Sequence, residues 1–398
     1  MNDTLKKYNS LIRQHVDNLI VASTPSNPAW NVEHSLAMSD VNRQTKSSKT
    51  AKWNYIDSCM ITALMSLYEA TKELHILNFC DNFVSYYIDN DGEILGYDMK
   101  DFNIDDINGG RNLIKLYQYT KKTKYKHAAD ILYIHLTQQP RTKEGSFFHK
   151  GIYPNQIWLD GLYMGQVFYS IYEKLYNNCK NFDDIFHQFA VCHSKMFDKN
   201  AKLYYHGYDS TKEIFWADKC TGLSKSFWLR SNGWLLCALV DCLEIFVSSV
   251  PKLKYSQLIE QLNQLLDGMM QYQDQGMFYQ VVDKVRQEGN YLETSGTAMV
   301  AYACLKAHRL GFRSNGYCEG QKIFAAICEH YLKVVENKLS LGGIVLVSGL
   351  GPKDNNRRDG SYEYYVSEPV VKDDAKGVMP FLLAYVELLL YNSFDKTV

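Results

Sequence analysis

The chain has 398 residues, of which 46% are hydrophobic and 22% are charged, and its formal net charge at pH 7 is −1. This balance is typical of a globular protein and lacks the basic footprint of a protein that binds nucleic acid or an anionic membrane. No apolar run approaches the ~20 residues that span a bilayer. Residues 1–20 show no apolar core followed by a small-residue cleavage site, so we expect no signal peptide.

Helical periodicity dominates the chain from one end to the other. Three short extended pieces, at Lys202–Tyr208, Met277–Asp283 and Gly343–Ser348, are predicted to be hairpin fragments inside loops. No Pro/Ser-rich linker marks a boundary, so residues 1–398 are expected to form one domain, with residues 1–50 as its first helix or a peripheral arm. Helices are predicted near residues 4–20, 50–71, 73–89, 105–121, 123–138, 159–176, 181–197, 227–247, 253–273, 290–310, 318–335 and 374–392.

These helices form a weak repeat of pairs. Five of them open with a polar, glycine-containing segment, and all but the last are followed by a second amphipathic helix. The N-terminal helix would supply the sixth partner, and small residues such as Gly233 and Gly296 suit close packing in an inner ring. The sequence therefore predicts an all-α fold, an (α/α)6 barrel of six helical hairpins with short β fragments in its loops. One end of each inner helix would face a common cleft.

The stretch Tyr153–Leu175 places Asp160 in the first turn of a helix, two residues after Trp158. Behind Asp160, apolar residues recur at steps of three and four and predict a buried face. A carboxyl group beside a tryptophan and over an apolar wall is expected to have a raised pKa. The alternative interpretation is that Asp160 only caps the helix.

Further polar residues lie in the segments that open the other inner helices. Paired carboxylates can perform acid/base work on a glycosidic bond, and an arginine can bind a substrate carboxylate. One of the two adjacent aspartates, at 105 or 106, is expected to cap its helix while the other faces the cleft. The candidates are Asp105, Asp106, His149, His206, Trp216, Asp218, Arg230, Trp234, Glu293, Arg357, Arg358, Tyr364, Tyr365 and Glu368.

Each of these candidates also has a purely structural interpretation. Arg230 can pair with a nearby acid at the start of its helix. His206 can be a hydrogen-bonded residue of a hairpin, and His149 can be an ordinary loop residue. Arg357 and Arg358 are expected to lie in a solvated loop.

The cysteines and histidines indicate the cellular compartment of the protein and whether it holds a metal site. None of the ten cysteines forms a CxxC pair, and several fall on apolar helical faces. This usage is typical of a reducing compartment and predicts a cytoplasmic protein. The eleven histidines show no HExxH motif or clustered ligand spacing, and there is no glycine-rich phosphate loop. We therefore expect neither a metal nor an organic cofactor.

Several motifs, taken in order, resemble those of glycoside hydrolase family 105, the unsaturated rhamnogalacturonyl hydrolases. They are IWLDGLYM, HGYDS, FWAD, RSNGW, YLETSGTAM and GSYEYYVSEPV, and the resemblance covers about residues 50–385. It implies an (α/α)6 barrel without a cofactor. By this resemblance Asp160 would be the acid and then the base, and Asp105 the second carboxylate. The positions that match the family's cleft are Trp158, His206, Arg230, Trp234 and, more loosely, His149.

The resemblance also implies a substrate, an oligosaccharide whose non-reducing end is a Δ4,5-unsaturated uronic acid left by a polysaccharide lyase. A carboxylic acid would protonate C4, water would add at C5, and the resulting hemiketal would open with loss of the glycosidic bond at C1. Rhamnose is the expected neighbouring sugar. Three alternatives stay open: an unsaturated glucuronyl hydrolase acting on glycosaminoglycan, an epimerase that uses His149 and His206 as proton carriers, and a non-catalytic sugar-binding barrel. A binder would not need both Asp105 and Asp160.

Overall fold

The computed structural model describes residues 3–32, 51–247, 249, 251–335 and 338–394. Residues 33–50, which the sequence analysis assigned to a possible peripheral arm, lie outside the described part. The helices are α1 (Asp3–Ala22), α4 (Tyr55–Thr71), α5 (Leu74–Ser85), α6 (Gly110–Thr120), α7 (Thr123–Gln138), α8 (Leu159–Gly161), α9 (Val167–Tyr176), α10 (Phe182–Met196), α11 (Leu229–Phe246), α12 (Lys252–Gln271), α13 (Thr294–Arg309), α14 (Gly316–Tyr331), α15 (Tyr362–Val366) and α16 (Ala375–Phe394).

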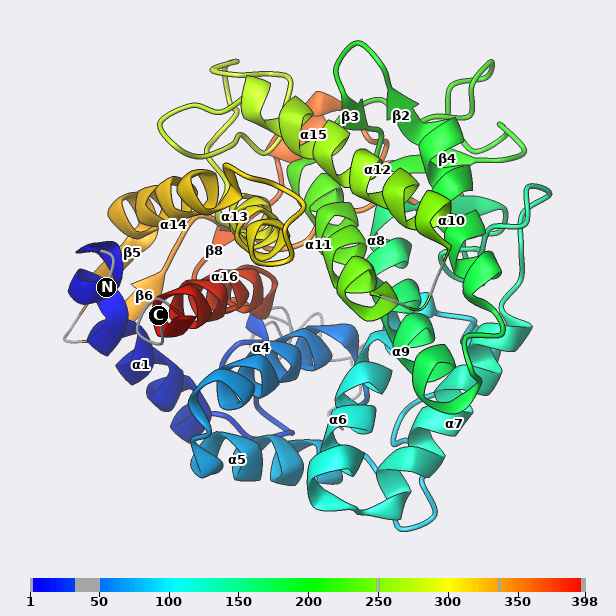
Figure 1. Cartoon of the computed structure of the whole chain (residues 1–398). Coiled ribbons are helices and arrows are strands. Elements are labelled where there is room, and N and C mark those ends of the chain that lie inside the picture. Colours follow the sequence, from blue (N-terminus) through cyan, green and yellow to red (C-terminus); the bar gives the residue numbers. More distant parts are fainter. Residues whose placement is uncertain (1–2, 33–50, 248, 250, 336–337, 395–398) are drawn as a thin grey trace.

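Six helices form a closed inner ring around a common centre (Figure 1). In the order α4, α6, α9, α11, α13 and α16, each packs against the next, and α16 closes the ring onto α4. Helices α5, α7, α10, α12 and α14 each follow an inner helix and lie outside it (Figure 1). The predicted (α/α)6 barrel is therefore confirmed.

Helix α1 supplies the sixth outer helix, as the repeat predicts. Asn9 accepts a hydrogen bond from Tyr385 of α16, and Arg13 pairs with Glu73 at the start of α5. The two ends of the described chain consequently lie together on the same side of the barrel (Figure 1).

The inner helices approach one another closely because their openings carry glycines. A Cβ atom at Gly110 would lie 2.5 Å from the ring of Phe168, and one at Gly233 would lie 2.7 Å from Sδ of Met299. These distances leave no room for a larger side chain without movement of the neighbouring helix. The expected role of small residues in the ring holds at both positions.

The short strands only partly match their predictions. The piece Lys202–Tyr208 contains β3 (Leu203–Tyr204), which pairs with β2 (Phe197–Asp198), and the start of β4 (Gly207–Asp209). The prediction of a local hairpin is wrong for β4, because β4 pairs with the distant β1 (Gln156–Trp158).

Two further differences lie in the last third of the chain. Met277–Asp283 makes only isolated bridges, and β7 (Ile344–Val345) pairs with β8 (Val370–Val371) rather than forming a hairpin of its own. The helix predicted at 318–335 ends at Tyr331, and β5 (Leu332–Val335) pairs with β6 (Lys338–Leu341). Two consecutive β-branched valines in β5 favour a strand over a continued helix.

Candidate active site

The starts of the inner helices converge at one end of the barrel, around a cavity of about 200 Å³. This volume is smaller than the roughly 300–1,000 Å³ of pockets for drug-sized ligands and suits one sugar ring rather than a chain. Of the seven site residues predicted from the sequence, the structure places six in the cavity wall, and the seventh, His206, lies directly behind it. The wall consists of Tyr55, Asp105, His149, Lys150, Tyr153, Trp158, Asp160, Met164, Trp228, Arg230, Trp234, Val347, Ser348, Gly349, Arg358 and Lys376.

Asp160 reaches the cavity from α8, directly after strand β1. The register of β1 and β4 aligns Trp158 with Gly207, which brings the preceding residue, His206, next to Asp160. His206 Nε2 donates to Oδ2 of Asp160 at 3.0 Å, and His206 Nδ1 lies 2.6 Å from the hydroxyl of Tyr365. The capping alternative for Asp160 is wrong, because Trp158 occupies the N-cap position of α8.

The pKa of Asp160 differs from the expectation of a raised value. Burial acts to raise this pKa, but the charge and hydrogen bond of His206, together with the charge of His149, outweigh burial. The net result is a pKa below the ordinary value of an aspartate. The expected rise rested on Trp158 and Asp105, whereas His206 reaches Asp160 through the β1–β4 pairing, which no local sequence pattern shows.

Asp105 lies in a 3₁₀ turn, Ile104–Gly109, that leads into α6. Its Oδ2 accepts an ion pair from Lys150 at 2.6 Å, while its buried Oδ1 has no hydrogen-bond partner among the described residues. The prediction that one of the two adjacent aspartates caps the helix is wrong, because Asn103 holds that position. Asp106 does not line the cavity; burial and the charge of Asp105 raise its pKa to about 7.

His149 is a buried residue of the cavity wall. Its ring stacks on Trp158 with a centroid distance of 4.4 Å, and its Nε2 lies 3.8 Å from Oδ1 of Asp105. Burial lowers the pKa of His149 to about 4, despite the opposing charges of Asp105 and Asp160. The ring is therefore neutral at pH 7, and Tyr153 extends the aromatic surface by stacking on Trp158 at 4.6 Å.

Arg230 lies in the first turn of α11 and is only 1% exposed. Its Nη1 donates to the carbonyl of Val345 at 2.7 Å and to Oγ of Ser295 at 3.2 Å, which are both neutral acceptors. The alternative that Arg230 pairs with an acid is not supported, because none of the described carboxylates forms an ion pair with it. A buried cation without a carboxylate partner is costly, so a cavity that holds one is suited to an anionic ligand.

Glu293 is a helix cap rather than a cleft residue. Its carboxylate accepts hydrogen bonds from the backbone N–H groups of Ser295 and Gly296 at the start of α13. It also accepts one from Val345 at 3.1 Å. The sequence analysis therefore misassigned Glu293 as a candidate for the cleft, since an acid at this position is a common N-terminal capping signal.

Two cations of the wall, Lys150 and Lys376, were not among the candidates predicted from the sequence. Lys150 directly follows His149 in the same loop, and Lys376 begins α16, where it pairs with Asp374 at 3.0 Å. The solvated-loop expectation holds for Arg357, which pairs with Glu368 and is exposed, but it is wrong for Arg358. Adjacent arginines in a loop give no sequence signal of which one turns inward.

The whole wall carries more positive than negative charge. Lys150, Arg230, Arg358 and Lys376 contribute four cations, against the carboxylates of Asp105 and Asp160. The positive ends of the inner helices add to this potential, because each begins at this end of the barrel. The cavity is therefore built for a small anionic ligand that meets an aromatic wall.

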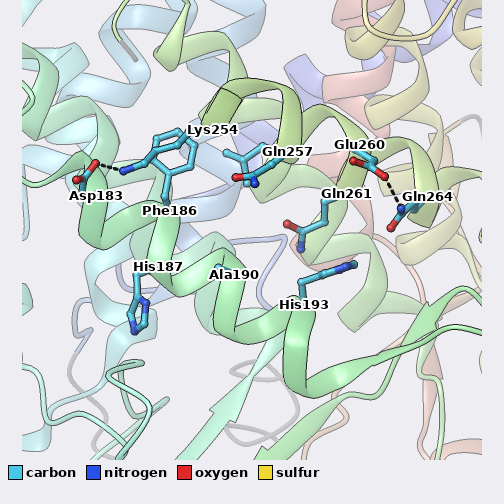
Figure 2. A pocket seen from close by; sticks show the side chains of 11 residues that line it. Asp183, Phe186, His187, Ala190, His193, Lys254, Gln257, Glu260, Gln261 and Gln264 are labelled. Carbon is cyan, nitrogen blue, oxygen red and sulfur yellow. Dashed lines mark hydrogen bonds and ion pairs between the residues drawn. The ribbon is translucent and has the colours of Figure 1, made fainter. Parts of the chain in front are cut away.

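Two larger hollows lie elsewhere. A groove of about 480 Å³ runs between the outer helices α10 and α12, where Lys254 pairs with Asp183 and Gln264 bonds to Glu260 (Figure 2). Another cavity, of about 340 Å³, lies among the later turns of the six inner helices, at the opposite end of the barrel. Its charged side chains are joined in a network of ion pairs, which includes Lys306 with Asp241. Neither hollow contains the predicted site residues.

Two features are absent from the described residues. No three His, Cys, Asp or Glu side chains among them gather in a way that could hold a metal ion. Within the same part of the chain, no helix combines the length and apolarity needed to cross a membrane.

Comparison with known proteins gives consistent matches. The model of "Glycosyl Hydrolase Family 88" matches residues 32–391. A solved family 105 glycoside hydrolase from C. acetobutylicum is 39% identical, with 89% of this chain and 98% of that chain covered and a TM-score of 0.81. Protein Atu3128 of Agrobacterium fabrum is 41% identical over 215 residues, which are 52% of this chain and 91% of the relative. The unsaturated rhamnogalacturonyl hydrolase YesR of Bacillus subtilis is 24% identical over 265 residues, covering 65% and 72% of the two chains.

The family model begins after α1 and includes every wall residue of the cavity. The matches confirm the resemblance inferred from the sequence motifs. The chain therefore belongs to the glycoside hydrolases of families 88 and 105, the group of unsaturated uronyl hydrolases.

Proposed function

We propose that this enzyme is an unsaturated rhamnogalacturonyl hydrolase, which removes the Δ4,5-unsaturated uronic acid from the non-reducing end of lyase-generated pectic oligosaccharides. The observation that carries the proposal is the Asp160–His206 pair at the wall of a cation-rich, one-sugar cavity. The name of the Bacillus subtilis relative YesR supports rhamnose as the neighbouring sugar.

Arg230 is the proposed partner of the uronate carboxylate. It is buried, and its described hydrogen bonds go only to neutral acceptors, so an entering carboxylate would supply the missing negative charge. Arginine forms paired hydrogen bonds with a carboxylate, which would fix the ring against Trp158 and Trp234. This orientation places the double bond beside Asp160.

Asp160 and His206 would handle the proton as a unit. Because the pKa of Asp160 is lowered, its resting carboxyl group is ionised and accepts the hydrogen bond from His206, so the proton for C4 would reach Asp160 through this hydrogen bond. Transfer from Asp160 to C4, with refilling from His206, would leave a cation at C5 that the ring oxygen stabilises. Asp160 then takes a proton from the water that adds at C5, and returns it to His206. The resulting hemiketal opens, and the glycosidic bond at C1 is lost.

Asp105 would serve as the second carboxylate. Its partner Lys150 keeps it close to the cavity, and its free Oδ1 can accept a hydrogen bond from a sugar hydroxyl. A non-catalytic binder gains nothing from keeping the Asp160–His206 pair as well. An epimerase is disfavoured because His206 does not line the cavity, so His149 and His206 do not face each other across a substrate.

We also propose a cytoplasmic location. All ten cysteines are free in the structure, and several are fully buried as small apolar side chains. This supports a reducing compartment.

The decisive experiment follows the ultraviolet absorbance of the conjugated double bond. Lyase-digested rhamnogalacturonan and lyase-digested glycosaminoglycan would be offered to the wild type and to Asp160→Asn. We expect absorbance loss with the first substrate only, and none with the folded variant. Loss only with glycosaminoglycan would keep the chemistry but overturn the leaving sugar. Loss with neither substrate would favour a sugar-binding protein.

A further inference from the structure

The cavity wall holds two arginines that form no direct ion pair with a described carboxylate. Lys150 pairs with Asp105 at 2.6 Å, and Lys376 pairs with Asp374 at 3.0 Å. Arg230 and Arg358 have no such ion pair with any described carboxylate. A substrate with one uronate carboxylate would neutralise only one of the two arginines.

The two arginines lie at different depths. Arg230 is fully buried in the first turn of α11, whereas Arg358 is half-buried in the loop that follows Gly349. A Cβ atom at Gly349 would lie 3.4 Å from the ring of Trp158 and 3.5 Å from Nη1 of Arg358. Arg358 therefore lies beside the outer edge of the aromatic wall. The backbone of Gly349 is fixed there by a hydrogen bond to the hydroxyl of Tyr364 at 2.9 Å.

This arrangement orders the substrate along the cavity. An enzyme that removes a terminal sugar holds that sugar in the closed part of its pocket, and the leaving part extends toward solvent. Arg230 is then within reach of the terminal uronate, and Arg358 is within reach of the leaving part. The guanidinium group matches both carboxylates and sulfates through paired hydrogen bonds.

We propose that Arg358 selects substrates with a second anionic group, a carboxylate or a sulfate, on the leaving part of the oligosaccharide. The inference rests on the proposed function, since it takes the terminal uronate to occupy the deep site. A rhamnogalacturonan fragment would supply the carboxylate from the uronate that follows rhamnose. A sulfated rhamnose would supply the same charge from a different source.

The test compares three ligands that share the unsaturated uronate: its disaccharide with rhamnose, the same disaccharide with a sulfate on rhamnose, and the trisaccharide in which a uronate follows rhamnose. Affinities are measured by calorimetry on the Asp160→Asn protein, so that no turnover is needed. The readout is the ratio of the affinity of each anionic ligand to that of the neutral disaccharide. The two anionic ligands separate the two sources of charge.

We expect at least one anionic ligand to bind more tightly, and Arg358→Gln to lower its ratio by about tenfold, a modest effect for a charge-assisted hydrogen bond. The matched control is Lys353→Gln, which removes the same charge from an exposed position of the same loop and should leave the ratio unchanged. If the Asp160→Asn protein bound the anionic ligands no more tightly than the neutral disaccharide, the inference would be overturned. Equal weakening of all three ligands by Arg358→Gln would also overturn it, because Arg358 would then bind the terminal uronate itself. If the proposed function fails, the wild type shows no absorbance loss, while the affinity ratios still decide the role of Arg358.

Discussion

At the scale of single residues, the pKa of Asp160, the proposed acid, is set by its hydrogen-bond partner more than by its burial. Burial alone would raise the pKa of Asp160, but His206 reverses the direction. The hydroxyl of Tyr365 holds the far nitrogen of the same imidazole, so the ring is fixed at both ends. In the proposed mechanism, the proton for C4 reaches Asp160 through its hydrogen bond with this imidazole.

The substitution His206→Gln tests whether His206 supplies the proton that Asp160 delivers to the substrate. Glutamine can still donate a hydrogen bond to Asp160, but it cannot hold the proton. We expect kcat to fall by about 10²–10⁴-fold, the usual range for a general acid or base. The double variant Asp160→Asn/His206→Gln should be no slower than Asp160→Asn, because residues that act as a unit are not additive. If steady-state assays instead showed that the loss of kcat in the double variant is the product of the two single losses, His206 would act on the substrate independently of Asp160.

The same pair sets the sign of the pH dependence. The proposed acid form of Asp160 carries a proton, and because the pKa of Asp160 lies below its ordinary value, the protonated fraction falls as the pH rises. The kcat/KM of the wild type should therefore fall on the alkaline side of its profile.

At the scale of secondary structure, the helix that carries Asp160 contains a π-helical turn, Leu162–Gln166, directly after α8. Such turns widen a helix and are frequent at functional sites. Arg111 of α6 donates to the carbonyl of Tyr163 inside this turn at 3.0 Å, and its guanidinium lies 4.2 Å from the centre of the Tyr163 ring. Tyr163 in turn stacks on Trp234, a wall residue of the cavity, at 4.8 Å. Arg111 thus supports both the acid and the wall from behind.

Arg111→Lys should therefore reduce catalysis although it keeps the charge. A single ammonium group cannot bond to Asn108, reach the Tyr163 carbonyl and stack on the ring at once. We expect kcat/KM to fall by about 10- to 100-fold, mainly through kcat, as for a displaced catalytic group.

The matched control for this substitution is Arg309→Lys. Arg309 makes a two-pronged pair with Glu387, and none of its described hydrogen bonds or ion pairs reaches the π-helical turn. The Arg309→Lys protein should be less stable than the wild type but should have an unchanged kcat. Equal losses of kcat in both variants would contradict a positioning role for Arg111.

The elements also show which features the sequence could predict. The helices α7 and α9 follow from local periodicity, and the closed ring follows from counting helix pairs. The strand β1 has only three residues, and it exists because β4, about fifty residues later, pairs with it. The approach of His206 to Asp160 depends on that pairing, so no local pattern predicts the direction of the pKa. The inward turn of Arg358 likewise depends on the path of its loop.

At the scale of the whole molecule, the two ends of the barrel differ in how their charged side chains are used: one end can bind an anionic ligand, and the other stabilises the fold. The end where the inner helices begin carries Arg230 and Arg358, which form no ion pair with a described carboxylate, and it is open to an anion. The later turns of the same helices enclose a network in which Lys306 contacts Asp241 at 2.7 Å, Glu244 at 2.8 Å and the hydroxyl of Tyr302 at 3.0 Å. Cations near helix C-termini are favourable. This network ties α11 to α13 and, through Arg309 and Glu387, to α16.

Lys306→Met should consequently destabilise the barrel without disturbing the reaction. The lysine side chain is only 7% exposed, and its loss leaves Asp241 and Glu244 without their shared cation. Asp241 keeps Arg111 at 3.5 Å and Glu244 keeps Arg309 at 3.0 Å. The cost should therefore stay below the roughly 3–5 kcal/mol of a fully uncompensated buried charge, but the midpoint of urea unfolding should still fall. Glu244, whose pKa is about 2 because Lys306 and Arg309 outweigh its burial, should then titrate at a higher pH.

Lys115→Met is the comparison for this prediction, because Lys115 pairs only with the partly exposed Glu69 at 2.6 Å and should cost no more than about 1 kcal/mol. For both variants, kcat/KM measured well below the unfolding midpoint should stay within about twofold of the wild type, since neither lysine lines the cavity at the other end. A loss of kcat/KM in Lys306→Met while the protein is still folded would mean that the network also holds the substrate cavity in shape. In that case the two ends of the barrel would be coupled through α11 and α13, and the separation of their tasks would be wrong.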